Sequence, residues 1–217
     1  MKSILVIGMG ILGQHLAAKM QELGNDVMIV DKDEAVIQKL SPAFKNSFAG
    51  DCTDEGVLRA LGVNNFDYCF VAIGEDFYAS LEITSILKEL GAQYVISKAK
   101  RARQAEFLKK IGADEVFYPE REIAEKLAVR YNATNIFDYI PLTSEYSIFE
   151  IPILPEWIGK NIITIDVRNK FQVNIIAIKN QNHLMPVPGG HYTFKENDHI
   201  VVIGKSNDVF KLSSKTK

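Results

Sequence analysis

Cysteine, long apolar runs and excess charge are all scarce in this chain of 217 residues. Its two cysteines, Cys52 and Cys69, are too few for a disulfide framework and lack the spacing of a metal site. No apolar run approaches the roughly 18 residues of a membrane span. The 25 basic and 27 acidic residues give a net charge of −2, and this charge does not favour nucleic-acid binding. We therefore expect a reduced, cytoplasmic protein that does not insert into a membrane and reaches one only through a partner.

What the sequence does contain is a strand, a glycine-rich turn and a helix at its start. The apolar run Ser3–Ile7 is typical of a buried parallel strand, and Gly8-Met9-Gly10-Ile11-Leu12-Gly13 follows it directly. A second apolar run, Val27–Val30, ends on Asp31, about 20 residues after the glycines. This context predicts a dinucleotide-binding turn. The alternative is a strand–helix–strand unit that needs small residues and binds nothing.

Each residue type in that turn has a physical role if a nucleotide binds. Gly8 allows a tight turn, Gly10 lets the backbone approach a pyrophosphate, and Gly13 lets the helix pack close to the sheet. The helix N-terminus offers unpaired N–H groups to the phosphates. Asp31 would accept hydrogen bonds from both hydroxyls of an adenosine ribose.

Helix ends marked by glycine recur through the first 120 residues, and an apolar strand candidate follows each one. They are Leu23-Gly24, Leu61-Gly62, Leu90-Gly91 and Ile111-Gly112. The alternation predicts an α/β fold, a doubly wound Rossmann-like parallel sheet of about six strands with helices on both faces. Short strands, a short helix near residues 161–169 and the Pro186–Gly190 cluster then predict a small α+β C-terminal domain. We place the domains at residues 1–135 and 136–217.

Polar and small residues follow the expected strands, where doubly wound sheets bind their ligands. The candidates are Asp31 with Lys32, Asp51-Cys52-Thr53, Ala72-Ile73-Gly74, Lys98 and Glu120. Asp51 would contact the adenine or its ribose, Lys98 the phosphates, and Glu120 a divalent cation beside them. Each has a simpler alternative: Asp51 or Thr53 caps the next helix, Lys98 is a solvated lysine, and Glu120 only favours a helix N-terminus.

An apolar crossover separates the two expected domains. A helix is expected from Glu120 to Val129, and the run Ile136–Ile140 after it is strongly apolar. Such a run at a domain edge needs cover, and we expect a dimer partner to supply it.

Catalytic side chains are not evident. His15 is expected to be exposed on the first helix, and His183, His191 and His199 are expected to face solvent in or beside turns. None has the spacing of a metal site or a catalytic triad. A nicotinamide dehydrogenase usually needs an acid–base residue, and the C-terminal 70 residues offer no obvious set. We therefore expect a bound nucleotide to act as a signal, with an NAD-dependent oxidoreductase as the alternative.

With these motifs the chain resembles the cytosolic regulatory subunits of Ktr/Trk-type potassium uptake systems, in which an RCK (KTN) domain precedes an RCK-C (TrkA-C) domain. The resemblance rests on the glycine turn, Val30-Asp31, Gly50-Asp51-Cys52-Thr53, Val71-Ala72-Ile73-Gly74 and Ile111-Gly112-Ala113-Asp114-Glu115-Val116 with Pro119-Glu120. It implies homodimers in an octameric ring beneath a membrane-embedded potassium transporter subunit, with the nucleotide gating potassium flux. An adaptor of another transporter is a second alternative.

The resemblance also bears on the ligands. Ile11 stands where Ktr subunits that prefer ATP often carry arginine, so NAD(H), ADP and ATP all stay open. In the C-terminal domain, a set of residues resembles the pattern of RCK-C domains that bind cyclic di-AMP: Ile162, Ile163, Asp166, Arg168, Asn174, Ile175 and Ile176, with Pro188 (or Pro186) as an apolar wall. Apolar side chains would pack on adenine and Arg168 would meet phosphate. The alternative is a plain core with an Asp–Arg surface pair.

Overall fold

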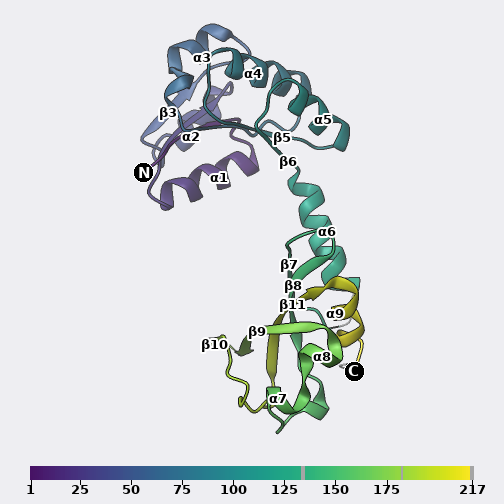
Figure 1. Ribbon diagram of the computed structural model, residues 1–217. Coiled ribbons are helices and arrows are strands. Elements are labelled where there is room, and N and C mark those ends of the chain that lie inside the picture. The colour runs from purple at the N-terminus through teal and green to yellow at the C-terminus, as the bar shows by residue number, and fades with distance from the viewer. Residues whose placement is uncertain (133–134, 182, 216–217) are drawn as a thin grey trace. The chain divides into compact units, whose positions relative to one another are not determined.

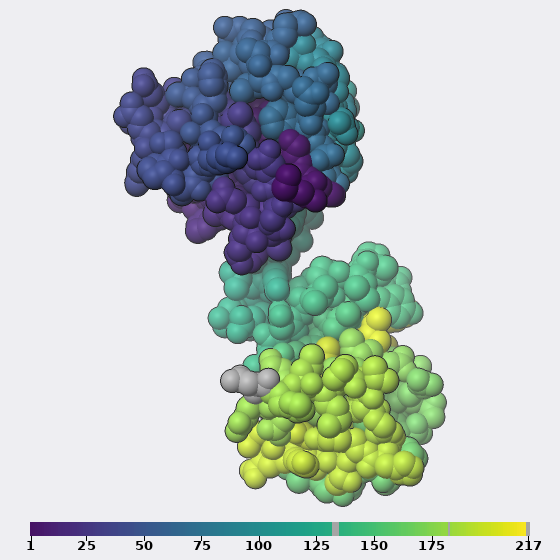
Figure 2. Space-filling view, turned by 90° about the vertical axis from the view of Figure 1, so that its left-hand side faces the viewer, coloured from purple at the N-terminus to yellow at the C-terminus, as the bar shows by residue number. Residues whose placement is uncertain are grey.

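The computed structural model describes residues 1–132, 135–181 and 183–215. They form two compact units, Met1–Arg121 and Glu122–Lys217 (Figure 1). Each unit is closely packed, as the space-filling view shows (Figure 2). The expected boundary at residues 135/136 falls inside the second unit and stays a prediction about the limits of the two binding modules.

The first unit is a six-stranded parallel sheet in the order β3-β2-β1-β4-β5-β6. Its elements are β1 (Ser3–Ile7), α1 (Ile11–Glu22), β2 (Asp26–Asp31), α2 (Glu34–Leu40), β3 (Asn46–Ala49), α3 (Glu55–Leu61), η1 (Val63–Asn65), β4 (Tyr68–Val71), α4 (Phe77–Glu89), β5 (Val95–Lys98), α5 (Ala102–Lys110) and β6 (Glu115–Phe117). The predicted doubly wound fold is confirmed. All four expected helix-ending glycines have positive φ, between 65° and 110°.

Both faces of this sheet are buried, because successive residues of a strand point to opposite sides. Leu5 of β1 packs in one cluster with Leu58 of α3 and Ile83 of α4. Val6 packs in another cluster, with Ala17 of α1 and Ile37 of α2 on the opposite face. Helices therefore cover both faces, with α3 and α4 on the same side (Figure 1).

The second unit is a five-stranded sheet in the order β10-β9-β11-β8-β7, antiparallel throughout. Its elements are α6 (Pro119–Asn132), which begins in the first unit, β7 (Asp138–Pro141), β8 (Tyr146–Pro152), η2 (Pro155–Trp157), α7 (Ile162–Ile165), α8 (Val167–Phe171), β9 (Val173–Asn180), β10 (His183–Pro186), β11 (Asp198–Lys205) and α9 (Ser206–Ser213). Phe149, Phe194 and Trp157 are buried in a core against one face of this sheet. The expected small α+β domain is confirmed.

Three local expectations need correction. The helix expected near residues 161–169 is two short helices, because Asp166 between them adopts a left-handed φ of 55°. The crossover is partly covered by its own chain: Ile136 is buried, while Phe137 and Ile140 stay half exposed. His199 does not simply face solvent, because its Nδ1 lies 2.9 Å from Glu150 Oε1 and its ring stacks on Phe137.

No helix in the described part of the chain is both long and apolar enough to span a membrane.

Candidate functional sites

A cavity of about 450 Å³ opens at the carboxyl ends of β1 to β4. Ten predicted site residues line it: Gly8, Gly10, Asp31, Lys32, Asp51, Cys52, Thr53, Ala72, Ile73 and Gly74. They come from turns that are far apart in the sequence and meet because the parallel strands end at one edge. Ile11, Leu12, Gly13, Lys98 and Glu120 do not line this cavity.

The three glycines of the turn differ in whether the surrounding protein leaves room for a side chain. Gly8 has a φ of +94°, and a Cβ on Gly13 would lie 2.0 Å from the carbonyl oxygen of Gly8. The fold itself therefore requires glycine at both positions. Gly10 has an ordinary φ of −65°, and a Cβ there would meet no atom within 4 Å. The protein atoms around Gly10, which lines the cavity, therefore leave room for a side chain.

The N-terminus of α1 faces the same turn. Gly10 is its N-cap residue, and no side chain caps the helix. The first N–H groups of the helix therefore keep the unsatisfied, positively polarised character that attracts phosphate. Ile11, directly after this cap, is largely exposed.

Asp31 joins the end of β2 to the glycine turn. Its Oδ2 accepts a hydrogen bond of 2.6 Å from the N–H of Met9, and its Oδ1 accepts one of 2.9 Å from the N–H of Asp33. The carboxylate is thereby held in one orientation at the cavity wall. Each oxygen keeps further acceptor capacity for a ligand hydroxyl.

Asp51 shapes the turn after β3. Its Oδ1 accepts from the Thr53 N–H at 3.0 Å and the Thr53 hydroxyl at 2.8 Å, and these hydrogen bonds lower the pKa of Asp51. The simpler reading of Asp51 or Thr53 as a helix cap is wrong. Asp54 caps α3 instead, because its side chain accepts from the Gly56 N–H at 2.8 Å.

Helix α4 supplies a wall that the sequence reasoning missed. Its contribution comes from the first turns and the residues just before them: Glu75, Asp76, Tyr78, Ala79, Glu82 and Ile83. Asp76 caps this helix by accepting a 3.0 Å hydrogen bond from the Ala79 N–H. An acid just after a strand-end glycine, Gly74-Glu75-Asp76, is the signal that could have found this wall.

Lys98 and Glu120 form an ion pair of 2.7 Å. Lys98 is not a solvated lysine, since only 11% of its side chain is exposed. The hydrogen bond from Lys98 is the main cause of a lowered pKa of Glu120. A Cβ on Gly74, which lines the cavity, would lie 3.4 Å from the Lys98 ammonium, so this ammonium lies next to the lining without being part of it.

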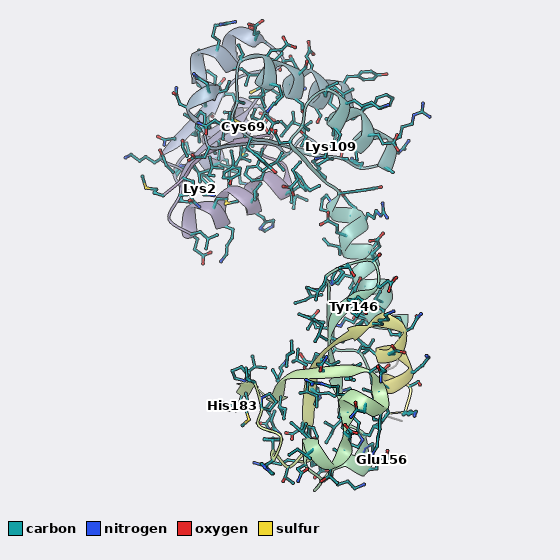
Figure 3. All side chains as sticks on the ribbon, in the orientation of Figure 1. Lys2, Cys69, Lys109, Tyr146, Glu156 and His183 are labelled. Atoms are coloured by element: carbon teal, nitrogen blue, oxygen red, sulfur yellow. The ribbon has the colours of Figure 1, made fainter. Side chains whose placement is uncertain are left out.

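The two cysteines are free and buried, and Cys69 lies in the interior of the first unit (Figure 3). Burial raises the pKa of both thiols to about 12. They therefore stay protonated at neutral pH and behave as small apolar side chains. The described residues contain no group of three or more His, Cys, Asp or Glu side chains that could hold a metal ion.

A second cavity, of about 430 Å³, lies in the second unit. It is lined by seven of the eight predicted C-terminal residues, Ile162, Ile163, Asp166, Arg168, Asn174, Ile175 and Pro188, together with Val167, Asn169 and Val173. Ile176 does not line it and lies where the register between β9 and β11 shifts.

The polar side chains of this second cavity hydrogen-bond to one another, which holds them in place. Arg168 donates from Nε to Asn174 Oδ1 at 2.7 Å, while Asn169 donates to both carboxylate oxygens of Asp166. The expected alternative of an Asp166–Arg168 surface pair is therefore wrong. With Nε engaged, the outer nitrogens of the Arg168 guanidinium stay available to an anion.

These features define the class: a Rossmann-type domain with a nucleotide-sized cavity at its glycine turn, followed by a small antiparallel domain with a cavity of its own. The TrkA-N domain family matches residues 4–119, and the TrkA-C domain family matches residues 147–216. The chain is 35% identical to Ktr system potassium uptake protein C of Bacillus subtilis, over 99% of this chain and 97% of that protein. It is 32% identical to Ktr system potassium uptake protein A of the same organism, over 96% and 94%. The chain therefore belongs to the family of Ktr/Trk potassium uptake proteins, and the resemblance noted from its motifs is confirmed.

Solved structures support the fold. The GsuK channel matches with a TM-score of 0.71 at 20% identity, over 96% of this chain and 38% of that one. A GsuK channel bound to NAD matches with a TM-score of 0.66 at 20% identity, over 99% and 38%. The chain thus spans under two fifths of these channel chains.

Proposed function

We propose that this chain is the cytoplasmic regulatory subunit of a potassium uptake system, and that its first unit senses an adenine nucleotide. The observation that carries the proposal is Gly10, a glycine that the fold does not need and that faces the cavity at an uncapped helix N-terminus. The names of the Ktr relatives support the link to potassium uptake. GsuK structures bound to NAD and to ADP support an adenine nucleotide.

The geometry suggests how each part of the nucleotide would be held. The phosphates would lie at Gly10 and the first N–H groups of α1, and the ribose hydroxyls at Asp31. Lys98 would turn from Glu120 to the terminal phosphates. Glu120, then free, would hold a divalent cation together with phosphate oxygens, since Mg²⁺ is often held by one carboxylate plus phosphates and waters.

In this proposal the nucleotide, NAD(H), ADP or ATP, is a signal rather than a reagent. Three of the five acids among the described residues that line the cavity hydrogen-bond to the protein backbone: Asp31 holds Met9, Asp51 holds Thr53, and Asp76 caps α4. Groups committed in this way orient a ligand. They are poorly suited to moving protons during a reaction.

The second unit is proposed to bind cyclic di-AMP. The Ile162-Ile163 pair and Pro188 would pack on adenine, and the ordered Arg168 guanidinium would meet phosphate. A ligand with two equal halves fits a two-fold interface in which each chain supplies the same residues.

We propose that assembly buries apolar side chains that are exposed on a single chain. Ile123, Leu127 and Tyr131 on α6 are exposed, and so are Phe137 and Ile140. Their cover by a second copy would give the homodimer that assembles into an octameric ring on a membrane-embedded potassium transporter subunit. The ring would lie at the inner face of the membrane through that partner.

The test is calorimetric titration of the purified chain with ADP, ATP, NAD and NADH, with cyclic di-AMP as a separate titrant. Binding of at least one adenine nucleotide is expected, with an affinity about ten- to a hundred-fold lower in a folded Gly10→Ala variant. Light scattering should show more than the 24.3 kDa of one chain. No binding of any of the four nucleotides would overturn the nucleotide-sensing role, and a monomer would overturn the assembly.

A further inference from the structure

The order of the strands determines where the base of a bound nucleotide must lie. β2, with Asp31 at its end, lies between β1, which carries the glycine turn, and β3. If the proposed function holds, the phosphates lie at β1 and the ribose at β2. The base then lies on the far side of the ribose, toward the turn after β3 that contains Cys52 and Thr53.

Two walls enclose that end of the cavity. Cys52 and Ile83 belong to one buried cluster, so the turn after β3 lies on the side of the sheet that α4 covers. Ala79, Glu82 and Ile83 are spaced as neighbours on one side of α4, and all three line the cavity. The turn after β3 and this side of α4 therefore both bound the cavity, and Glu82 is the exposed member of the three.

Glu82 differs from the other acids of this cavity. Asp31, Asp51 and Asp76 accept hydrogen bonds from the backbone, and Glu75 pairs with Lys100 at 2.7 Å. Among the residues that the structure describes, the Glu82 carboxylate has no hydrogen bond or ion pair, although it lines the cavity. An ionised carboxylate only accepts hydrogen bonds, so a ligand that meets it must donate one.

We propose that Glu82 selects the base of the nucleotide by accepting a hydrogen bond from the 6-amino group of adenine. Hypoxanthine has an oxygen at that position, and this oxygen would face the carboxylate without a proton between them. A site built to accept from an amino group rejects an analogue that lacks the group.

The experiment measures selectivity rather than affinity alone. The full chain is titrated with ADP and IDP, and in parallel with NAD and nicotinamide hypoxanthine dinucleotide. The variants are Glu82→Ala, Glu82→Gln and a control, Glu89→Ala. Glu89 is exposed on the same helix, bonds to Ser85 and does not line the cavity.

The wild type should prefer the adenine ligand by about five- to ten-fold, as one exposed charged hydrogen bond allows. Glu82→Ala should abolish the preference by weakening the adenine ligand, while the hypoxanthine ligand binds as well as before or more tightly. Glu82→Gln should also abolish it, because its amide accepts from an amino group and donates to an oxygen. Glu89→Ala should keep the wild-type ratio. A structural role for Glu82 would move both affinities together.

A preference that survives in folded Glu82→Ala, or a wild type that prefers hypoxanthine, would overturn this inference and leave the nucleotide-sensing role intact. A wild type that binds none of these four ligands, and neither ATP nor NADH, would overturn the proposed function and this inference with it. GDP is titrated as a further ligand, and tighter binding of GDP than of ADP would also overturn the assignment.

Discussion

Alanine at two glycines of the same turn should have opposite consequences. At Gly10 the backbone φ of −65° suits any residue, and the added Cβ meets no atom within 4 Å. Gly10→Ala should therefore leave the free energy of unfolding unchanged or raise it by up to about 1 kcal/mol, because alanine restricts the unfolded chain. At Gly13 the added Cβ would lie 2.0 Å from the Gly8 carbonyl oxygen, where real Cβ atoms keep at least 3.0 Å.

To relieve that clash, α1 must move away from the turn until the Cβ is at least 3.0 Å from the Gly8 oxygen. Overpacking of this kind lowers the free energy of unfolding by roughly 1–3 kcal/mol. Each kcal/mol should lower the unfolding temperature by roughly 2–8 °C for domains in this size range. For binding, the methyl group of Gly10→Ala would separate a phosphate from the backbone. Loss of one charged hydrogen bond of about 1.5–3 kcal/mol would weaken ADP or NAD by about ten- to a hundred-fold.

Two assays separate these effects. Far-UV circular dichroism during heating follows both units, while fluorescence of Trp157 reports the second unit and serves as the internal control. Calorimetric titration with ADP and NAD measures the affinity of the first unit for nucleotide. Wild-type nucleotide affinity in Gly10→Ala would refute the placement of phosphates at this residue. Wild-type stability in Gly13→Ala would refute the close approach of α1 to the turn.

Three further outcomes are expected. Asp31→Ala should weaken adenine-nucleotide binding by about ten- to a hundred-fold in a chain that still folds, because a charged acceptor of the ribose hydroxyls is lost; an unchanged titration curve would refute the assignment. Arg168→Ala should abolish heat from cyclic di-AMP and leave nucleotide binding intact, and equal loss at both sites would instead indicate misfolding. Partial burial of Glu150 opposes its ionisation, but hydrogen bonds from Lys179 and His199 outweigh it and lower the pKa of Glu150 below its usual 4.5. That carboxylate therefore stabilises the second unit above about pH 4.5, and the contribution is lost as pH falls through the lowered pKa; urea unfolding followed by the single tryptophan should show a smaller acid sensitivity in Glu150→Gln than in the wild type.

Some cavity-lining residues could be predicted from the sequence and others could not, for a physical reason. Asp51, Ala72 and Gly74 were predicted from strand ends alone, because parallel strands present those ends at one edge whatever the details of packing. The wall from α4 depends on the phase at which that helix packs on the sheet, which apolar periodicity only loosely defines. Ile176 does not line the second cavity, and a register shift between β9 and β11, which the sequence does not reveal, falls at this residue.

The sequence by itself determined the alternation of strands and helices, the glycine turn and the acid at the end of β2. These are local features: periodicity, positive φ and the steric room that a tight turn demands act within a few residues. Tertiary structure alone decided the partners of the charged groups. Lys98 meets Glu120 from the start of α6, Arg168 meets Asn174 rather than Asp166, and His199 meets Glu150 across neighbouring strands. Such pairs join residues that are close only once strand order, register and helix packing are complete, so no local pattern specifies them.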